Sequence, residues 1–385
     1  MNNSFITFGS PLITKKEINE VSSVMKSGWL GTGPKVHQFE KNFSNYKKIK
    51  YASALNSCTA ALSLSLLSLG IGDGDEVITT ALTFCATINS IINSRAKPIL
   101  VDVEYNSQNI DPEKIEQKIT SKTKAIIIVH FAGRPCNMDK ILKLVKKYKL
   151  FLIEDCAHAI ESKYKNIHCG SFGDFGCFSF YVTKNLTTGE GGMIVSNSKK
   201  NISKIKTLSL HGMTKDAWKR YGKKGIINYD VIQSGYKYNM MDMQAAMGIY
   251  QLKNIEKNYR KRERIWNFYN ESFKNLNLDT PFPAEKNTRH AYHLYTLQIN
   301  KNRCGINRED FAQKMKENNV GIGIHYKSIP SFTFYKKNFK WQVDDYPNAK
   351  KIGNETISIP ISPKLSEKQV IKITEIVKKI FSKYA

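Results

Sequence analysis

No stretch of the sequence is apolar for long enough to cross a membrane. Even the strongly apolar residues 125–129 end at His130, whereas a transmembrane helix needs about 20 predominantly apolar residues. Residues 1–5 contain neither a basic start nor an apolar segment, so the sequence predicts no signal peptide. These absences favour a cytoplasmic protein without a membrane partner.

Cysteine is scarce and scattered. The seven cysteines, at positions 58, 85, 136, 156, 169, 177 and 304, are odd in number and never spaced C-x-x-C. This distribution argues against a disulfide framework and against a structural zinc site. We therefore expect reduced, mostly buried thiols and no metal.

Acidic residues are few compared with basic ones: 33 Asp and Glu stand against 59 Lys and Arg, a net charge of +26. Such an excess suits anionic partners, namely nucleic acid, a membrane surface or phosphorylated metabolites. It also suits an AT-rich coding sequence, because much of it is lysine scattered beside Asn and Ile. Neither a helix-turn-helix nor a strand face of aromatic and basic residues is recognisable, so we expect no nucleic-acid partner.

The chain of 385 residues, 41% of them hydrophobic, is long enough for two domains of about 100–200 residues each. It contains no internal repeat or low-complexity tract. Up to about residue 250, short apolar segments alternate with segments of helical pattern. The strand-like segments are 76–80, 97–101, 125–131, 150–154, 176–180 and 192–196, and the helix-like ones are 59–69, 84–93, 112–119, 138–148 and 199–208.

This alternation predicts an α/β fold with a doubly wound, mostly parallel sheet, whose functional residues gather at the carboxyl ends of the strands. We assign that domain to residues 1–250. Residues 251–385 are predicted to form a smaller α/β domain, with helices at 254–273, 308–318 and 366–383 and strands at 292–299 and 321–325.

One lysine, Lys184, lies at a position that suits a reactive amine. Lys184 follows the predicted strand 176–180 and precedes the glycine-rich residues 189–192. Burial at a strand end penalises the ammonium form, and a neutral lysine amine forms a Schiff base with an aldehyde. The alternative is that Lys184 is an ordinary loop lysine in a lysine-rich chain.

An apolar strand at 151–154 leads to Asp155, with His158 three residues later. Pyridoxal phosphate requires a carboxylate that keeps its ring nitrogen protonated, so Asp155 complements Lys184. Two other interpretations remain: Asp155 caps a helix, and His158 is a hydrogen-bonded core histidine.

Residues 56–62 change from a strand to a helix through Ser57, Cys58 and Thr59. Free amides at a helix start bind phosphate, although ordinary helix caps use the same residue types. Phe84 begins another predicted helix, where its ring can stack on a planar cofactor or pack in the core. A phosphate cradle, an aromatic ring, an aspartate and a lysine at one sheet edge are what a phosphorylated pyridine aldehyde requires.

These motifs are similar to those of the DegT/DnrJ/StrS family of pyridoxal-phosphate-dependent sugar aminotransferases. The resemblance extends from about Ile18 to Ile380 and rests on residues 27–34 with 39–40, 56–62, 72–78, 154–159, 179–192 and 235–240 with 244–246. It implies the aspartate-aminotransferase-like fold (fold type I). Within the family the chain most resembles enzymes that aminate carbon 4 of a nucleotide-linked sugar, including the one that forms UDP-4-amino-4-deoxy-L-arabinose.

The resemblance also implies roles for individual positions. Lys184 would carry pyridoxal 5'-phosphate (PLP) as an internal aldimine. Asp155 would contact the pyridine nitrogen, and Phe84 would stack on the ring. The phosphate would lie at the Cys58 amide, Thr59 and Ser179, with His158 close to the cofactor.

Family members are homodimers in which the segment matching 236–239 reaches the partner's active site, so Lys237 and Asn239 are further cofactor candidates. Candidates to contact the substrate are Tyr181, Arg220, His325 and Tyr326. The resemblance implies an amino transfer from L-glutamate, which becomes 2-oxoglutarate, through pyridoxamine phosphate to the keto sugar, with Lys184 carrying the proton. The product would serve the synthesis of a surface glycan such as lipopolysaccharide.

The chain departs from the family pattern at three places. Cys58 replaces a usual Gly or Ala, Tyr181 replaces a common His, and Lys237 with Asn239 replace Asn and Arg. Lys184 argues against the dehydratase branch, which has histidine there. Three alternatives stay open at this stage: a carbon-3 aminotransferase, a basic nucleic-acid-binding regulator and a catalytically silent PLP sensor.

Overall fold

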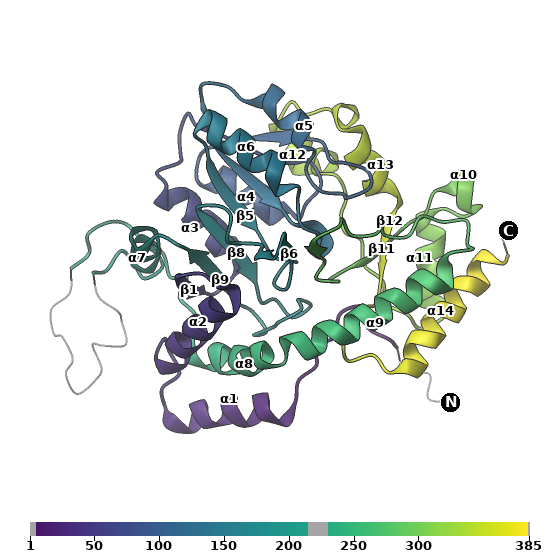
Figure 1. The fold of residues 1–385 in the computed structure, drawn as a ribbon, viewed down its shortest axis with the longest axis horizontal. Helices are drawn as coiled ribbons and strands as arrows, with labels where there is room; N and C mark the ends of the chain where they lie inside the picture. The colour runs from purple at the N-terminus through teal and green to yellow at the C-terminus, as the bar shows by residue number, and fades with distance from the viewer. Residues whose placement is uncertain (1–4, 215–229, 384–385) are drawn as a thin grey trace.

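The computed structural model describes residues 5–214 and 230–383. Its main sheet has seven strands in the order β1-β9-β8-β5-β4-β2-β3. Neighbouring strands from β8 to β3 pair in parallel, and β9 alone runs against its neighbours β8 and β1. The predicted mostly parallel α/β sheet is therefore confirmed (Figure 1).

The strands of the described residues are β1 Tyr51–Leu55, β2 Glu76–Thr80, β3 Lys97–Val101, β4 Thr123–Val129, β5 Phe151–Asp155, β6 Lys163–Tyr164, β7 Ile167–His168, β8 Phe175–Ser179, β9 Gly192–Ser196, β10 Thr288–Arg289, β11 Tyr295–Gln298 and β12 Thr356–Ile359. The α-helices are α1 Lys15–Ser27, α2 Pro34–Lys47, α3 Cys58–Ser68, α4 Cys85–Asn93, α5 Pro112–Ile115, α6 Met138–Tyr148, α7 Lys199–Leu208, α8 Asp242–Lys253, α9 Ile255–Phe273, α10 Lys301–Cys304, α11 Arg308–Glu317, α12 Thr333–Asn338, α13 Pro347–Glu355 and α14 Glu367–Phe381.

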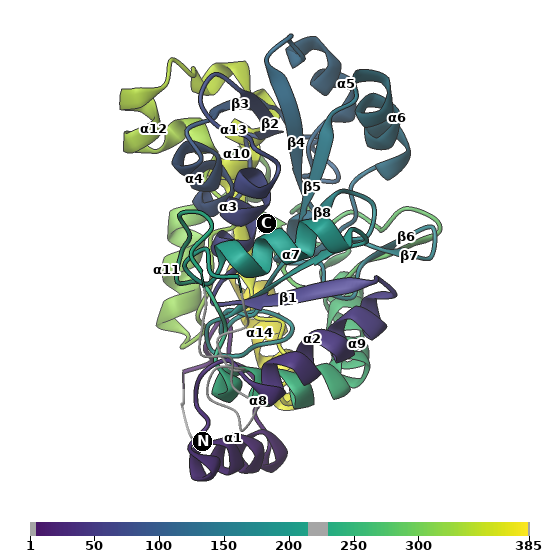
Figure 2. The ribbon, with the colours of Figure 1, turned by 90° about the vertical axis from the view of Figure 1, so that its left-hand side faces the viewer.

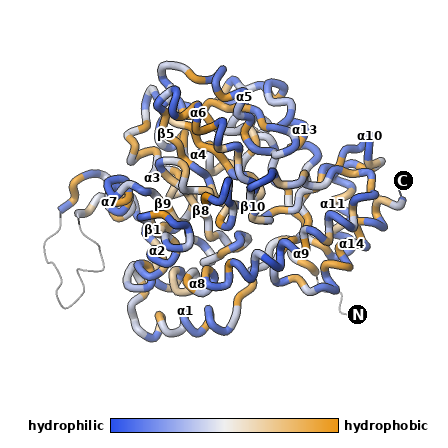
Figure 3. The backbone as a smooth tube through the Cα atoms, in the orientation of Figure 1, coloured by the Kyte–Doolittle hydropathy of each residue, from blue (hydrophilic) through white to orange (hydrophobic). Residues whose placement is uncertain are grey.

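Helices cover both faces of the sheet, because its central strands are apolar on both sides. In β4, Ala125 and Ile127 join the core formed with α3, α4 and α7, whereas Ile126 and Ile128 join the core formed with α5 and α6. Figure 2 shows α3 and α4 on one side of β4 and β5 and α6 on the other. The apolar colouring of Figure 3 is concentrated on these strands and on the inner helix faces.

The C-terminal part forms a smaller unit around the antiparallel pair β11–β12, with α9, α11 and α14 packed in one core. Ile6 joins this core and bridges to Val320, so the start of the chain packs with its end. The long helix α9 runs from the large unit to the small one (Figure 1). The division into residues 1–250 and 251–385 stays a prediction.

The structure differs from the sequence-based prediction at two places. The predicted strand at 321–325 is wrong, since only Gly323 makes a bridge there, to Ser358. The N-terminal helices α1 and α2 were not predicted, although Thr14 and Glu17 form a capping box at the start of α1. Within the described residues, no helix combines the length and the apolar character needed to span a membrane.

Candidate active site

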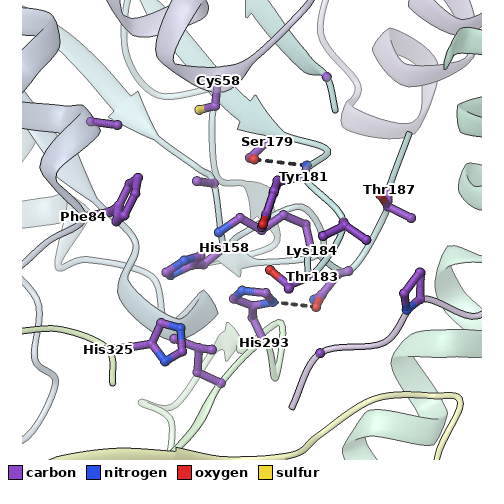
Figure 4. A pocket seen from close by; sticks show the side chains of 18 of the residues that line it. Cys58, Phe84, His158, Ser179, Tyr181, Thr183, Lys184, Thr187, His293 and His325 are labelled. Carbon is purple, nitrogen blue, oxygen red and sulfur yellow. Dashed lines mark hydrogen bonds between the residues drawn. The ribbon is translucent and has the colours of Figure 1, made fainter. Parts of the chain in front are cut away.

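The predicted site residues converge because their strands end at the same edge of the sheet. Asp155 ends β5 and Ser179 ends the adjacent β8. Strand β9 runs in the opposite direction, so its first residue, Gly192, lies at this edge between Leu55 and Ser179. A cavity of about 340 Å³ opens there (Figure 4).

Most of the residues proposed from the sequence line this one cavity: Cys58, Thr59, Phe84, Asp155, His158, Ser179, Tyr181, Lys184, His325 and Tyr326. Lys237 and Asn239 do not line it within the single chain. Asn239 donates from Nδ2 to Thr32 Oγ1 at 2.7 Å, and the Lys237 carbonyl accepts from Asn56 Nδ2 at 3.4 Å. Arg220 lies outside the described residues.

Lys184 extends across the middle of the cavity (Figure 4). Its backbone N–H donates to the carbonyl of Tyr181 at 2.9 Å, which closes the turn after β8. Burial lowers the pKa of Lys184 to about 8, although the negative charge of Asp155 acts in the opposite direction. With this pKa roughly a tenth of the amine is uncharged at pH 7, far more than for an ordinary lysine, and this fraction is able to act as a nucleophile or base.

Asp155 is buried and held by two donors. Thr87 Oγ1 donates to its Oδ2 at 2.9 Å, and the Ala157 N–H donates to its Oδ1 at 3.1 Å. Burial raises the pKa of Asp155, while these hydrogen bonds and the charge of Lys184 act to lower it. No helix follows Asp155, so the helix-capping interpretation is wrong: the bond from Ala157 belongs to a turn, and the carboxylate borders the cavity.

His158 is buried, as its core interpretation predicted, and both ring nitrogens have partners. Its Nδ1 accepts the backbone N–H of Ala132 at 3.2 Å, and its Nε2 lies 3.1 Å from the hydroxyl of Tyr326. Burial first, and then the charge of Lys184, lowers the pKa of His158 well below its usual value. This histidine therefore stays neutral.

The start of α3 has the features expected of a phosphate cradle. Ser57 caps the helix by accepting from the Ala60 N–H at 3.1 Å. The N–H groups of Cys58 and Thr59 have no acceptor among the described residues, as is usual for the first turn of a helix. Gly192 packs directly on the Ser57–Cys58 peptide, because a Cβ at position 192 would lie 2.4–2.6 Å from its atoms.

Phe84 is not a core residue. Its side chain is 57% exposed, and its ring lies at the start of α4 with its centroid 5.8 Å from that of Tyr326. Tyr181 is also exposed at the cavity. Two aromatic rings thus present open surface to the space beside Lys184, as stacking on a planar ligand requires.

Sequence reasoning missed several residues of the cavity wall. The His293 ring lies tilted against that of His158, with the ring centroids 4.5 Å apart, and its Nδ1 lies 2.9 Å from Asn185 Oδ1. Thr87 and Arg262 also line the cavity. Asn185 could have been predicted as a site residue because it directly follows Lys184. His293, Thr87 and Arg262 come from distant segments and belong to no motif.

A second group of chemically active side chains lies behind the site. His130, Glu154 and Cys156 are buried and close enough to share a ligand. The oxygens of Glu154 and the nitrogens of His130 are already occupied, however: Glu154 accepts from His130 Nε2 at 3.0 Å and from the N–H groups of Gly170, Phe172 and Gly173. The Nδ1 of His130 accepts from the Cys136 N–H. These bonds fix the loop between β5 and β8.

Comparison with known proteins identifies relatives over the full length. SpsC, a spore coat polysaccharide biosynthesis protein of Bacillus subtilis, is 45% identical over 380 residues, 98% of this chain and 97% of SpsC. Spr1654 from Streptococcus pneumoniae, solved in its PMP form, has a TM-score of 0.91 and 33% identity, covering 99% of this chain and 100% of that one. Helicobacter pylori PseC, an aminotransferase involved in the biosynthesis of pseudoaminic acid, has a TM-score of 0.91 and 28% identity, with 99% and 100% coverage.

These similarities define the class: a PLP-dependent aminotransferase of fold type I. Residues 11–378 match the model of the DegT/DnrJ/EryC1/StrS aminotransferase family, and the chain belongs to that family. The comparisons give no support to the nucleic-acid-binding regulator, the alternative that the charge of the chain raised.

Proposed function

We propose that this enzyme transfers an amino group from L-glutamate to the keto group of a nucleotide-linked sugar, at carbon 4, for the synthesis of a surface polysaccharide. The observation that carries the proposal is the pairing of Lys184, with a pKa of about 8, and the buried Asp155 in one cavity. The naming of SpsC as a polysaccharide biosynthesis protein and of PseC as an aminotransferase for pseudoaminic acid supports a sugar substrate.

The residues present fit pyridoxal phosphate. The phosphate would accept from the free N–H groups of Cys58 and Thr59, where the helix N-terminus adds favourable electrostatics. Gly192 leaves room for the peptide that carries the first of these groups. Asp155 would face the ring nitrogen, and Phe84 would stack on the ring. When bound, the cofactor supplies an electrophilic carbon and a ring that accepts an electron pair.

The chain's own groups would then handle the protons. Lys184 Nζ takes a proton from the carbon that carries the amino group of the donor and returns one on the cofactor side, and the reverse sequence aminates the sugar. Asp155 keeps the ring nitrogen protonated in both directions. The Tyr326 hydroxyl, oriented by His158, is placed to donate into the cavity.

Substrate contacts would come from the residues at the cavity mouth. Tyr181, His325 and Tyr326 line the cavity, and Lys237 and Arg220 would meet the diphosphate of the carrier. The protein would act as a homodimer, in which residues 236–239 of one chain reach the active site of the other.

The decisive experiment follows the visible absorption of the purified holoenzyme when L-glutamate is added. We expect the band of the bound cofactor to disappear in the wild type and to persist in Lys184→Ala. A panel of 4-keto and 3-keto nucleotide sugars added to the glutamate-treated enzyme should restore the band, with 4-keto sugars the faster. No reaction with glutamate would contradict the donor, and faster recovery with 3-keto sugars would contradict carbon 4.

A further inference from the structure

The cavity wall contains a histidine that no step of the proposed mechanism uses. His293, just before β11, is 6% exposed and lines the cavity that contains Lys184 (Figure 4). Its Nδ1 lies 2.9 Å from Oδ1 of Asn185, the residue directly after Lys184. Its other nitrogen, Nε2, has no hydrogen-bond partner within residues 5–214 and 230–383.

This unused nitrogen is open to the cavity. In the described part of the chain, the fully buried side-chain nitrogens and oxygens without a partner all belong to other residues, so Nε2 of His293 retains accessible surface. The His158 ring lies against one side of the imidazole, with the ring centroids 4.5 Å apart. Because His293 lines the cavity, a molecule bound beside Lys184 can approach Nε2.

The hydrogen bonds of Asn185 determine where His293 carries its proton. The Nδ2 of Asn185 donates to Glu161 Oε2 at 2.9 Å and to the Ala291 carbonyl at 3.0 Å. These two acceptors identify the amide nitrogen, so the atom that faces His293 is the amide oxygen, which only accepts. The Nδ1 of His293 must therefore be the donor of the bond between them.

The imidazole of His293 is uncharged. Burial first, and then the charge of Lys184, lowers the pKa of His293 well below its usual value. A neutral imidazole has a single proton, and here that proton is on Nδ1, so Nε2 carries a lone pair. Polar atoms enclosed by protein are nearly always paired, and this acceptor therefore calls for a donor that enters with the substrate.

We propose that His293 Nε2 accepts a hydrogen bond from a hydroxyl group of the keto sugar, on the carbon next to the one that reacts. This inference rests on the proposed function, because it assigns a contact with the sugar to a particular residue. The hydroxyl must be close to the reacting carbon, since His293 is bonded to the residue that follows Lys184. In a 4-keto pyranose it is the hydroxyl at carbon 3, because carbon 5 carries the ring oxygen.

The same nitrogen does not serve the amino donor. The carboxylates of L-glutamate only accept hydrogen bonds, and its amino group is the group that reacts. A carboxylate facing Nε2 would bring two acceptors together without a proton between them. Loss of Nε2 should therefore slow the reaction with the sugar selectively.

Two variants separate the nitrogens of His293. In His293→Asn the amide nitrogen takes the position of Nδ1 and keeps the bond to Asn185, while nothing replaces Nε2. In His293→Gln the amide oxygen takes the position of Nε2 as an acceptor, while the bond to Asn185 is lost. Stopped-flow absorbance of the holoenzyme measures each half-reaction by itself, and circular dichroism monitors the fold.

We expect His293→Asn to react with the keto sugar about tenfold more slowly and with L-glutamate less than about twofold more slowly, because one hydrogen bond to the sugar is lost. His293→Gln should keep the ratio of the two rates within about twofold of the wild type. If both half-reactions of His293→Asn slow by the same factor, His293 acts only through Asn185, and the inference is overturned.

A substrate analogue identifies the hydroxyl. The probe is the 4-keto nucleotide sugar that reacts fastest with the glutamate-treated wild type, and the analogue is the same compound without the hydroxyl at carbon 3. Removal of this hydroxyl should slow the wild type about tenfold and His293→Asn less than about twofold, because the variant has already lost the bond. Equal slowing of both proteins would overturn the inference.

His290→Asn is the matched control. His290 is in the same segment, is also buried and has a lowered pKa because of burial, but it does not line the cavity. Its Nδ1 accepts the N–H of Tyr292 at 2.8 Å, a role that the amide oxygen of asparagine can take over. Both half-reactions of this variant should stay within about twofold of the wild type.

The tautomer of His293 is tested without any reaction. Nitrogen-15 NMR of the apoenzyme near pH 7 should show a protonated Nδ1 and an unprotonated Nε2 for His293, assigned by the signals that His293→Asn loses. A proton on Nε2 would overturn the inference. If the wild type takes no amino group from L-glutamate, or passes it to no keto sugar, the proposed function fails instead, whatever the spectrum shows.

Discussion

The Nε2 of His158 and the hydroxyl oxygen of Tyr326 lie 3.1 Å apart, and the surroundings determine which atom donates. His158 is neutral, and its Nδ1 accepts the Ala132 N–H, so its single proton must be on Nε2. Nε2 therefore donates to Tyr326, whose own O–H is left to point elsewhere. Burial raises the pKa of Tyr326, so this proton is retained.

Replacement Tyr326→Phe tests this arrangement. It removes the O–H and keeps the ring contacts with Phe84 and Phe131. We expect both half-reactions to slow about tenfold, because one hydrogen bond is worth about 1–1.5 kcal/mol. Stopped-flow absorbance of the holoenzyme measures this effect.

His158→Gln is the companion to that variant. The glutamine amide reaches the position of Nε2 and can donate to Tyr326, so this variant should retain more activity than His158→Ala. A full rate in Tyr326→Phe would show that the hydroxyl proton has no role.

A second prediction concerns the pH dependence of cofactor attachment. Only the uncharged amine of Lys184 attacks an aldehyde, so the rate at which added PLP forms the visible band on the apoenzyme should rise with pH to a plateau. The midpoint should lie near pH 8, below the usual value of about 10.4 for lysine.

Asp155→Asn should move that midpoint further down. The negative charge of Asp155 stabilises the ammonium form and raises the pKa of Lys184, so its removal leaves burial unopposed. The midpoint, not the absolute rate, is the quantity to compare, because the variant also loses the partner of the ring nitrogen. An upward shift would show that the two groups do not interact as the structure indicates.

Gly192 provides a test of the phosphate cradle. In Gly192→Ala the new Cβ would overlap the Ser57–Cys58 peptide and push it away from the helix start. We expect PLP to bind at least tenfold more weakly, as measured by equilibrium dialysis. Gly189→Ala is the control: it has φ of +79° but nothing within 4 Å, so it should cost about 1 kcal/mol of stability and leave PLP affinity unchanged. Equal PLP affinity in both variants would contradict the assignment of the phosphate site to the start of α3.

What could be predicted from the sequence depended on local signals. Strands β2, β3 and β9 and helices α6 and α7 coincide with the predicted segments, because each has a clear apolar pattern and a turn at its ends. Asp155 and Lys184 were recognisable because the first ends a buried strand and the second lies in the turn after one. That their strands are neighbours is a property of the sheet order, which the pattern of apolar residues does not specify.

The residues that were missed act across long separations in sequence. Arg262 contacts Glu161 a hundred residues away in the chain, and its own helix, α9, shows only an unremarkable basic pattern. Thr87, in the first turn of α4, donates to Asp155, which lies 68 residues further along the chain. Such contacts depend on tertiary packing, so a single sequence carries no periodic or spacing signal for them.

The proposed homodimer leads to a prediction about an exposed apolar surface. Val231, Ile232 and Tyr236 expose apolar surface shortly before Lys237, and Ile232 is 60% exposed. Ile232→Asp should reduce the mass seen by light scattering from that of a dimer to that of a monomer and abolish turnover. An unchanged mass and rate would place the interface elsewhere.

Shared active sites would also allow complementation between two inactive proteins. If Lys237 serves the cavity of the partner, a refolded mixture of Lys184→Ala and Lys237→Ala chains contains dimers in which one site carries both substitutions and the other carries neither. Random pairing makes half of the dimers mixed, and each of these has one complete site, so the mixture should recover roughly one quarter of the wild-type activity. If Lys237 serves the cavity of its own chain, each site retains one of the substitutions, and the mixture stays inactive.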